Sequence, residues 1–255
     1  MPKYSDFSAA IFDVDDTLLN NYPKGHSAGL HEESRLRAVH ALGRRYDIKE
    51  LLEFTVEENI AAFRDAPVHS LEGAVWNVLL MTGLANGDVI EKNNPLFREI
   101  VDLKDALHED TLRTLGEEVP GATRFVRSLA KHGMTGHLAI ASTAIKRDIT
   151  ISLDILGLRD LFPDKCIISK DRFQHPKPHP EAFELALASL ELNTLPERVL
   201  AFEDDPRGII SAKATGLFTC AITTRYTKKA LQELAIAPDL IANSFAEFEQ
   251  LLDLN

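Results

Sequence analysis

The sequence predicts an α/β fold, in which a parallel sheet carries helices and a separate helical segment is inserted after the first strand. Two observations predict it. Short, continuously apolar runs alternate with helical patterns at the start of the chain and after residue 119, as strands and crossover helices do in a parallel sheet. Between residue 31 and about residue 118, helical patterns dominate and no convincing strand-like run occurs. The 255 residues suffice for one large domain or two modest ones.

Five apolar runs are predicted as strands buried on both faces, because polar residues do not alternate within them. These strands are Ala9–Phe12, Leu138–Ala141, Cys166–Ile168, Val199–Phe202 and Leu217–Ile222.

Helical periods fill the gaps between these strands. Gly133 ends the first of these helices, and Pro180 and Pro206 suit the first position of a helix. Right-handed crossovers are expected throughout. The predicted helices are Ala122–His132, Ile145–Leu156, Pro180–Leu190 and Pro206–Ala214.

The inserted block has its own helices, predicted over His31–Tyr46, Lys49–Arg64 and Ser70–Thr82, with a weaker stretch to Glu118. Turn-rich residues 20–30 are expected to form a hinge into it, and the second hinge is expected before Pro120. We therefore expect a core domain of residues 1–20 and 119–255 and a helical cap of residues 21–118. Trp76 and its apolar neighbours are expected to form the core of the cap.

Composition excludes some classes of partner. The net charge of −11 disfavours nucleic acid, whose phosphates need a basic surface. No secretory signal or membrane-spanning run is visible, so we expect a cytoplasmic protein without a membrane partner, as a monomer or weak dimer. Cys166 and Cys220 are expected as buried thiols in strands.

Carboxylates follow the first predicted strand, in Asp13-Val14-Asp15-Asp16-Thr17. Ligands of an open α/β sheet bind at the carboxyl ends of its strands, where Asp13 would project. A carboxylate there can attack phosphorus, and Asp15, two residues on, can act as acid and base. An Asx turn would also explain these residues.

A second acidic segment, Glu203-Asp204-Asp205, ends another apolar run. Carboxylates that face Asp13 would repel one another unless a cation lay between them, and hard oxygen ligands suit Mg²⁺. A helix N-terminus, where acidic residues are also favourable, is the alternative explanation.

Two further polar segments complete the pattern. Ser142-Thr143 follows the strand that ends at Ala141, where a hydroxyl and backbone amides could hold a phosphoryl oxygen or simply cap a helix. Lys177 lies between Pro176 and Pro178, in a rigid segment that can present it as a fixed charge; a solvated lysine is the alternative. His175 and His179 flank it, and we assign them no role.

Taken together, these four segments resemble the motifs of the haloacid dehalogenase-like hydrolase superfamily. The resemblance covers residues 9–19 and 119–223, with Gly208-Ile209 continuing the fourth motif. It implies a Rossmann-like core with an inserted helical cap, and a Mg²⁺-dependent reaction through an aspartyl phosphate.

The resemblance also implies roles for individual residues. Asp13 would be the nucleophile and a metal ligand, and Asp15 the acid and base, with its backbone carbonyl on the metal. Ser142 and the Thr143 backbone would bind phosphate, and Lys177 would hold Asp13 and the phosphoryl group. Asp204 would be the main ligand of the fourth motif, and Glu203 would ligate directly or through water.

Two positions depart from the commonest family pattern: Asp16 replaces a glycine, and Asp205 replaces a frequent serine. The division of metal ligation among the three acids of the fourth motif is therefore open.

The expected activity is hydrolysis of small phosphate monoesters. A sugar-phosphate mutase would use the same core residues, with a cap cation for a distal phosphate; the candidates are Arg35, Arg37, Arg44, Arg45 and Arg64. A non-catalytic binding module is the third possibility. Asp15 argues against a dehalogenase, because displacement of halide needs no proton donor.

Overall fold

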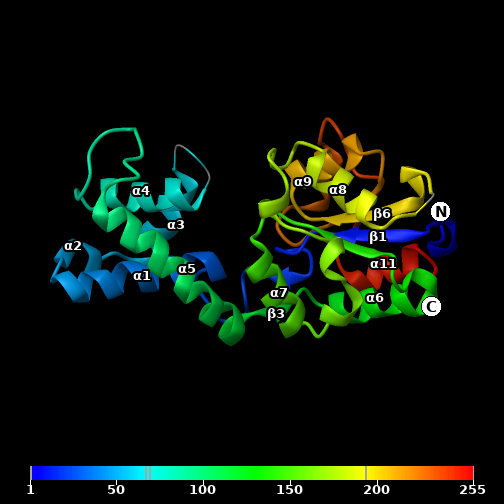
Figure 1. Ribbon diagram of the computed structural model, residues 1–255, viewed down its shortest axis with the longest axis horizontal. Coiled ribbons are helices and arrows are strands. Elements are labelled where there is room, and N and C mark those ends of the chain that lie inside the picture. Colours follow the sequence, from blue (N-terminus) through cyan, green and yellow to red (C-terminus); the bar gives the residue numbers. More distant parts are fainter. Residues whose placement is uncertain (1, 67, 69, 193, 255) are drawn as a thin grey trace. The chain divides into compact units, whose positions relative to one another are not determined.

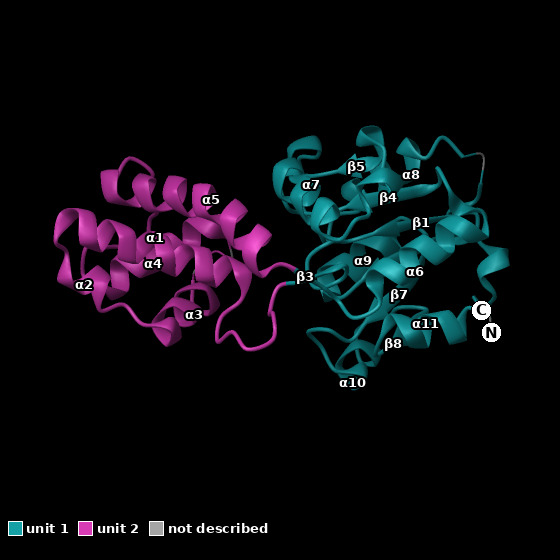
Figure 2. Ribbon diagram, turned by 90° about the horizontal axis from the view of Figure 1, so that it is seen from below, with its two compact units in different colours: residues 1–20, 117–255 teal, residues 21–116 magenta. Residues whose placement is uncertain are grey.

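The computed structural model describes residues 2–66, 68, 70–192 and 194–254. The chain forms two compact units, one of residues 1–20 and 117–255 and the other of residues 21–116, coloured separately in Figure 2. We call them the core and the cap. No helix in the described residues is both long and apolar enough to cross a bilayer.

The core contains a six-stranded sheet in which every pair of neighbours is parallel. The strand order is β5-β4-β1-β6-β7-β8. The five predicted runs supply the first five of these strands, and β8 is an addition. The bounds are β1 Ala9–Phe12, β4 Leu138–Ala141, β5 Ile167–Ile168, β6 Val199–Glu203, β7 Phe218–Ile222 and β8 Leu240–Ala242.

Helices cover both faces of this sheet (Figure 1). On one face, Ile11 and Ala201 pack in a cluster with Phe183 of α8 and Ala212 of α9. On the other face, an aromatic cluster joins the two central strands to α6 and α11. The rings of Phe12 and Phe202 stack at 4.8 Å, and Phe125, Phe245 and Phe248 surround Phe202. Burial on both faces explains why these strands read as unbroken apolar runs.

The core helices lie close to their predicted positions up to Ile222. They are α6 Ala122–Leu129, α7 Lys146–Ile155, α8 Glu181–Ser189, α9 Pro206–Ala214, α10 Lys228–Gln232 and α11 Phe245–Leu251. The first ends earlier than expected, because residues Ala130–Met134 form a π-helical turn with Gly133 at φ 109°. Cys166 was expected in a strand but lies in the 3₁₀ turn before β5; it is buried, as is Cys220 of β7.

The described residues of the cap form five helices: α1 Leu30–Tyr46, α2 Lys49–Leu52, α3 Val56–Arg64, α4 Leu71–Met81 and α5 Pro95–Leu115. The single helix predicted over Lys49–Arg64 is wrong. Thr55 interrupts it by accepting the Glu58 N–H at 3.1 Å while Glu58 accepts the Thr55 N–H, a capping box that begins α3. Trp76 is fully buried in the cap core and lies edge-on to Phe97.

A short antiparallel pair stands where the cap is inserted. Leu19–Asn20 (β2) pairs with Glu117–Glu118 (β3), and Asn20 Nδ2 donates to Glu117 Oε1 at 3.0 Å. Glu117 and Glu118 were expected in the cap, but this pairing places them in the core. The second boundary therefore falls after residue 116 instead of residue 118.

Candidate active site

The site is built where β1 and β6 end side by side. Phe12 is in register with Phe202, and the Asp13 N–H donates to the Phe202 carbonyl at 3.0 Å. The next residues, Asp13 and Glu203, therefore reach the carboxyl edge of the sheet together. Both are buried. Two segments 190 residues apart in the chain thus bring their acidic residues to one place.

Lys177 lies between these two carboxylates. Its Nζ donates to Asp13 Oδ1 at 2.7 Å and to Glu203 Oε1 at 2.5 Å, and only 7% of its side chain is exposed. Burial alone lowers the pKa of Lys177, but the charges of Asp13 and Glu203 outweigh it and raise the pKa above its ordinary value. Lys177 is therefore a permanent cation at neutral pH.

Hydrogen bonds hold both carboxylate oxygens of Glu203 in place. Its Oε2 accepts the backbone N–H groups of Asp204 and Asp205 at 3.1 and 3.3 Å, while its Oε1 accepts from Lys177. Gly208 of α9 gives it room, since a Cβ there would lie 1.8 Å from Glu203 Oε1. Burial raises the pKa of Glu203 to about 7, against the lowering effect of Lys177.

Asp204 has one oxygen bonded and one without a partner. Thr17 Oγ1 donates to Asp204 Oδ1 at 3.1 Å, whereas Oδ2 is buried and has no hydrogen bond within the described part of the chain. Burial raises the pKa of Asp204 well above its usual range, and the charges of Glu203 and Asp13 raise it further. A buried acceptor without a donor is costly, and a cation would satisfy it.

The donor set fits a hard divalent cation. Asp13, Glu203 and Asp204 each offer a carboxylate oxygen, all within 4.8 Å of one another. Burial also raises the pKa of Asp13, and Lys177 is the cation that pairs with Asp13 and Glu203 in this buried cluster. An all-oxygen set of this kind suits Mg²⁺. Because both Glu203 oxygens already accept hydrogen bonds, Asp204 Oδ2 is the atom most in need of a cation.

The remaining predicted residues stand at the same edge of the sheet. Asp15 is half-buried just beyond β1, in a turn whose backbone bridges to Leu19. Ser142 is buried at the end of β4, the strand next to β1, and its Oγ accepts the Ala144 N–H at 3.1 Å. Thr143 is exposed. Among the hydrogen bonds of the described residues, none joins Ser142 or Thr143 to Asp13 or Lys177.

One charged residue near the acids was not singled out in the sequence. Arg225 follows β7 at the same edge, and its guanidinium lies 3.6 Å from Asp16 Oδ2 and 3.5 Å from Asp205 Oδ2. Asp16 and Asp205 are the two positions that depart from the commonest family pattern. Arg225 therefore lies within ion-pair distance of both. The available signal was its place three residues after the apolar run that ends at Ile222, near the carboxyl edge of the sheet.

Four of the five arginines considered for the cap have partners within it. Arg35 is buried and donates to the side chain and backbone of Asn59. The other three pairs are Arg37 with Asp110, Arg45 with Glu99, and Arg64 with Asp65.

The sequence alone did not indicate that Lys104 of the cap is buried. Lys104 has only 6% of its side chain exposed; its Nζ lies 3.4 Å from His31 Nδ1 and 3.5 Å from Asp105. The ring of His31 stacks on that of His108 at 4.2 Å. Burial lowers the pKa of His31 well below its usual range, and the neighbouring His108 and Lys104 add to the effect. His31 is therefore held neutral.

Comparison with known proteins finds relatives in sequence and proteins of the same fold. The chain is 32% identical over 222 residues to a phosphorylated carbohydrates phosphatase of Thermotoga maritima, covering 82% of each chain. The structure of the present chain resembles that of a Thermotoga maritima protein assigned as a beta-phosphoglucomutase. The TM-score is 0.71 and the identity 22%, with coverage of 97% of this chain and 99% of the other. The structure also resembles CbbY of Rhodobacter sphaeroides in complex with phosphate, with a TM-score of 0.63, 25% identity and coverage of 95% and 96%.

The family model described as haloacid dehalogenase-like hydrolase matches residues 7–216, which include all four acidic, hydroxyl and lysine segments. The chain belongs to the haloacid dehalogenase-like hydrolase family.

Proposed function

We propose that the protein is a Mg²⁺-dependent phosphatase that hydrolyses small phosphate monoesters through an aspartyl phosphate on Asp13. The observation that carries this proposal is the bond from Lys177 Nζ to Asp13 Oδ1, 2.7 Å long, inside a buried cluster of carboxylates. Lys177 lowers the pKa of Asp13 against the larger raising effect of burial, and its bond to Oδ1 leaves the second oxygen for attack. A nucleophilic carboxylate beside a fixed cation is suited to an anionic phosphoryl group.

The reaction would proceed in two displacements. In the first, a carboxylate oxygen of Asp13 attacks phosphorus, the bond from phosphorus to the ester oxygen breaks, and Asp15 gives its proton to the departing alcohol. In the second, water attacks the phosphorus of the aspartyl phosphate while Asp15 accepts a proton from it. The bond from phosphorus to the Asp13 oxygen breaks, phosphate leaves, and both aspartates are restored.

The metal site supports the same proposal. Asp13, Asp204 and the backbone carbonyl of Asp15 would hold Mg²⁺, with Glu203 acting directly or through water. When bound, Mg²⁺ supplies positive charge that offsets the repulsion between carboxylate and phosphoryl oxygens. Lys177 and the hydroxyl of Ser142, with the Thr143 backbone, would bind the phosphoryl oxygens. The cap would exclude bulk water and select the substrate.

Two similarities support a small phosphorylated substrate. One relative is named for its action on phosphorylated carbohydrates, and one similar structure was solved with phosphate. A mutase, which passes the phosphoryl group to a second hydroxyl, has less support, because Arg35, Arg37, Arg45 and Arg64 are paired within the cap.

The test uses p-nitrophenyl phosphate with native protein, Asp13→Asn and Asp15→Asn, with Mg²⁺ and with a chelator. We expect metal-dependent phosphate release by the native protein and none by Asp13→Asn. This substrate has a good leaving group that needs little protonation. Asp15→Asn should therefore be phosphorylated but hydrolysed slowly, and its intact mass should rise by one phosphoryl group. Asp160→Asn, an exposed aspartate, is the control.

Full activity of Asp13→Asn would refute the mechanism. Phosphorus NMR with a hexose phosphate distinguishes the alternatives: free phosphate indicates a phosphatase, whereas an isomeric sugar phosphate without release indicates a mutase. If the native protein shows neither activity across a panel of sugar and nucleotide phosphates, the proposal fails.

A further inference from the structure

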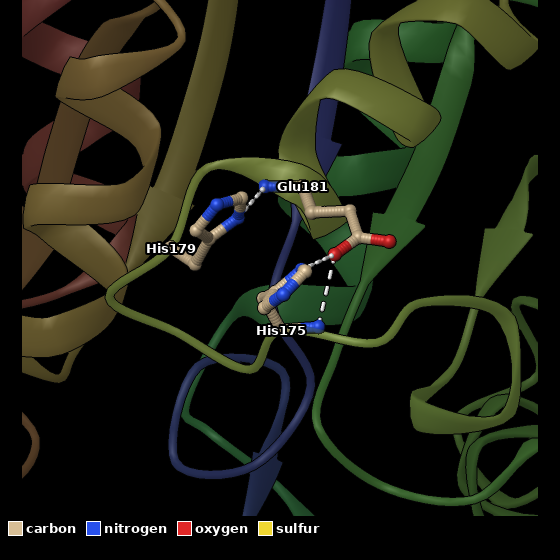
Figure 3. Close-up of side chains that lie close together, drawn as sticks. All are labelled: His175, His179 and Glu181. Carbon is tan, nitrogen blue, oxygen red and sulfur yellow. Dashed lines mark hydrogen bonds and ion pairs between the residues drawn. The ribbon is translucent and has the colours of Figure 1, made fainter.

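Two histidines of the segment that carries Lys177 lie close to a glutamate of the helix that follows it (Figure 3). His175 and His179 belong to the proline-rich segment before α8, and Glu181 is the first residue of α8. One ring nitrogen of each histidine and one carboxylate oxygen of Glu181 lie within 4.8 Å of one another. The two rings are 4.6 Å apart and inclined at 32°.

The Nδ1 edges of both rings face Glu181. His175 Nδ1 lies 2.8 Å from Glu181 Oε2, and His179 Nδ1 accepts the Glu181 N–H at 3.2 Å (Figure 3). The His179 lone pair is directed at the Glu181 N–H, and one ring nitrogen of each histidine lies in one small volume with a Glu181 carboxylate oxygen. We propose that His175, His179 and Glu181 form a binding site for one transition-metal ion of the Zn²⁺ class, separate from the acid cluster.

The ligand types distinguish this site from the one at Asp13. Two imidazoles and one carboxylate suit a borderline cation such as Zn²⁺, whereas the three carboxylates of the acid cluster suit Mg²⁺. His175 and His179 are exposed, so an ion can enter from solvent and keep water on its remaining position. Both sites can therefore be filled at once by different metals.

The backbone holds the ligands close before any ion arrives. Pro176, Pro178 and Pro180 alternate with the residues of this segment and fix its φ angles. The Glu181 carboxylate also accepts the N–H groups of Gln174 and His175, at 3.0 and 2.9 Å. Little conformational freedom therefore remains to be lost on binding.

Binding would exchange existing hydrogen bonds for bonds to the ion. In neutral His175 the ring proton would move from Nδ1 to Nε2, freeing the Nδ1 lone pair. The Glu181 N–H would lose its bond to His179 and bond to water instead, because Glu181 is the first residue of α8 and its N–H lies at the exposed end of that helix. A protonated histidine would release its proton to solvent, so binding would weaken in acid.

The test is calorimetric titration of the full chain with ZnCl₂ in excess Mg²⁺, for native protein and for His175→Asn, His179→Asn and the double variant. Asparagine places a donor and an acceptor near the position of Nδ1, so it can keep the local hydrogen bonds without binding the ion well. We expect one Zn²⁺ per native chain, about ten-fold or more weaker binding in each single variant, and no saturable binding in the double variant.

Two controls locate the ion. His26→Asn removes an exposed histidine elsewhere, and Asp204→Asn removes a ligand of the acid cluster; both should bind Zn²⁺ like the native chain. The proposal is overturned if the double variant binds Zn²⁺ unchanged, if Asp204→Asn abolishes binding, or if excess Mg²⁺ displaces Zn²⁺ from the native chain. Circular dichroism of each variant shows that the fold is kept.

Discussion

Arg225 should stabilise the two acidic segments at the edge of the sheet, and Arg225→Gln should remove this effect. The guanidinium lies 3.6 Å from Asp16 and 3.5 Å from Asp205, and 38% of the side chain is exposed. A pair exposed to this degree is screened by solvent and contributes about 0.5–1 kcal/mol, so two pairs contribute about 1–2 kcal/mol. For a protein of this size, each kcal/mol corresponds to about 2–4 °C in melting temperature.

The assay is thermal unfolding in a chelator, in a double-mutant cycle against Asp16→Gly/Asp205→Ser. Glycine suits the left-handed backbone of Asp16, at φ 57°, and serine can replace Asp205 as the N-cap of α9. In that background Arg225 keeps only its longer-range attraction to Asp204 among these acids, so Arg225→Gln should have a much smaller effect. Arg207→Gln is the control, because among the described residues Arg207 forms an ion pair with Asp205 and none with Asp16.

The result that would refute this reasoning is equal destabilisation by Arg225→Gln in both backgrounds. That outcome would mean that Arg225 stabilises the fold by packing rather than by charge. High salt gives a second check, because screening should shrink the effect of Arg225→Gln more strongly in the native background.

Three further predictions concern the core and the cap. Gly208→Ala should push Glu203 aside and slow p-nitrophenyl phosphate hydrolysis by about 10²-fold, with an unchanged circular dichroism spectrum; an unchanged rate would contradict the close contact. Lys177→Met should cost about 3–5 kcal/mol in a chelator near pH 8 and less near pH 6. The reason is that the raised pKa of Glu203 favours its protonated form as pH falls; denaturant titrations that show equal losses at both values would count against this. Neutral His31 should make the native chain less stable as pH falls below about 6.5, by up to about 1.4 kcal/mol per pH unit. His31→Asn should flatten this slope in urea titrations and the exposed His26→Asn should not; identical slopes would disprove it.

The sequence was sufficient for five of the six strands of the sheet and for part of the site. The strands that end at Phe12, Ala141 and Phe202 are buried on both faces, so their apolar runs are unambiguous. Residues directly after such strands must gather at one edge, which is why Asp13 and Glu203 could be placed together.

Other features depend on contacts that no local pattern encodes. Beyond Ile222 no element was predicted, and β8 is an edge strand of three residues of which two are only half-buried, so its apolar signal is weak. The interruption between α2 and α3 could have been predicted, because Thr55 and Glu58 have the spacing of a capping box.

The sequence also does not show which charged side chains become buried or paired, as Arg225 and Lys104 illustrate. Both read as ordinary solvated cations, and only the three-dimensional structure brings Arg225 to Asp16 and buries Lys104 beside His31.

The pairing of β2 with β3 carries a consequence for how such a protein can be built. Asn20 and Glu117 are directly opposite each other in this antiparallel pair, at the point where an ordinary hairpin would have its two-residue turn. The 96 residues from Asn21 to Gly116 thus take the place of a turn. An Asn-Gly link from Asn20 to Glu117 would preserve the strand register, so at this junction whole caps can be exchanged or removed as cassettes without redesigning the sheet.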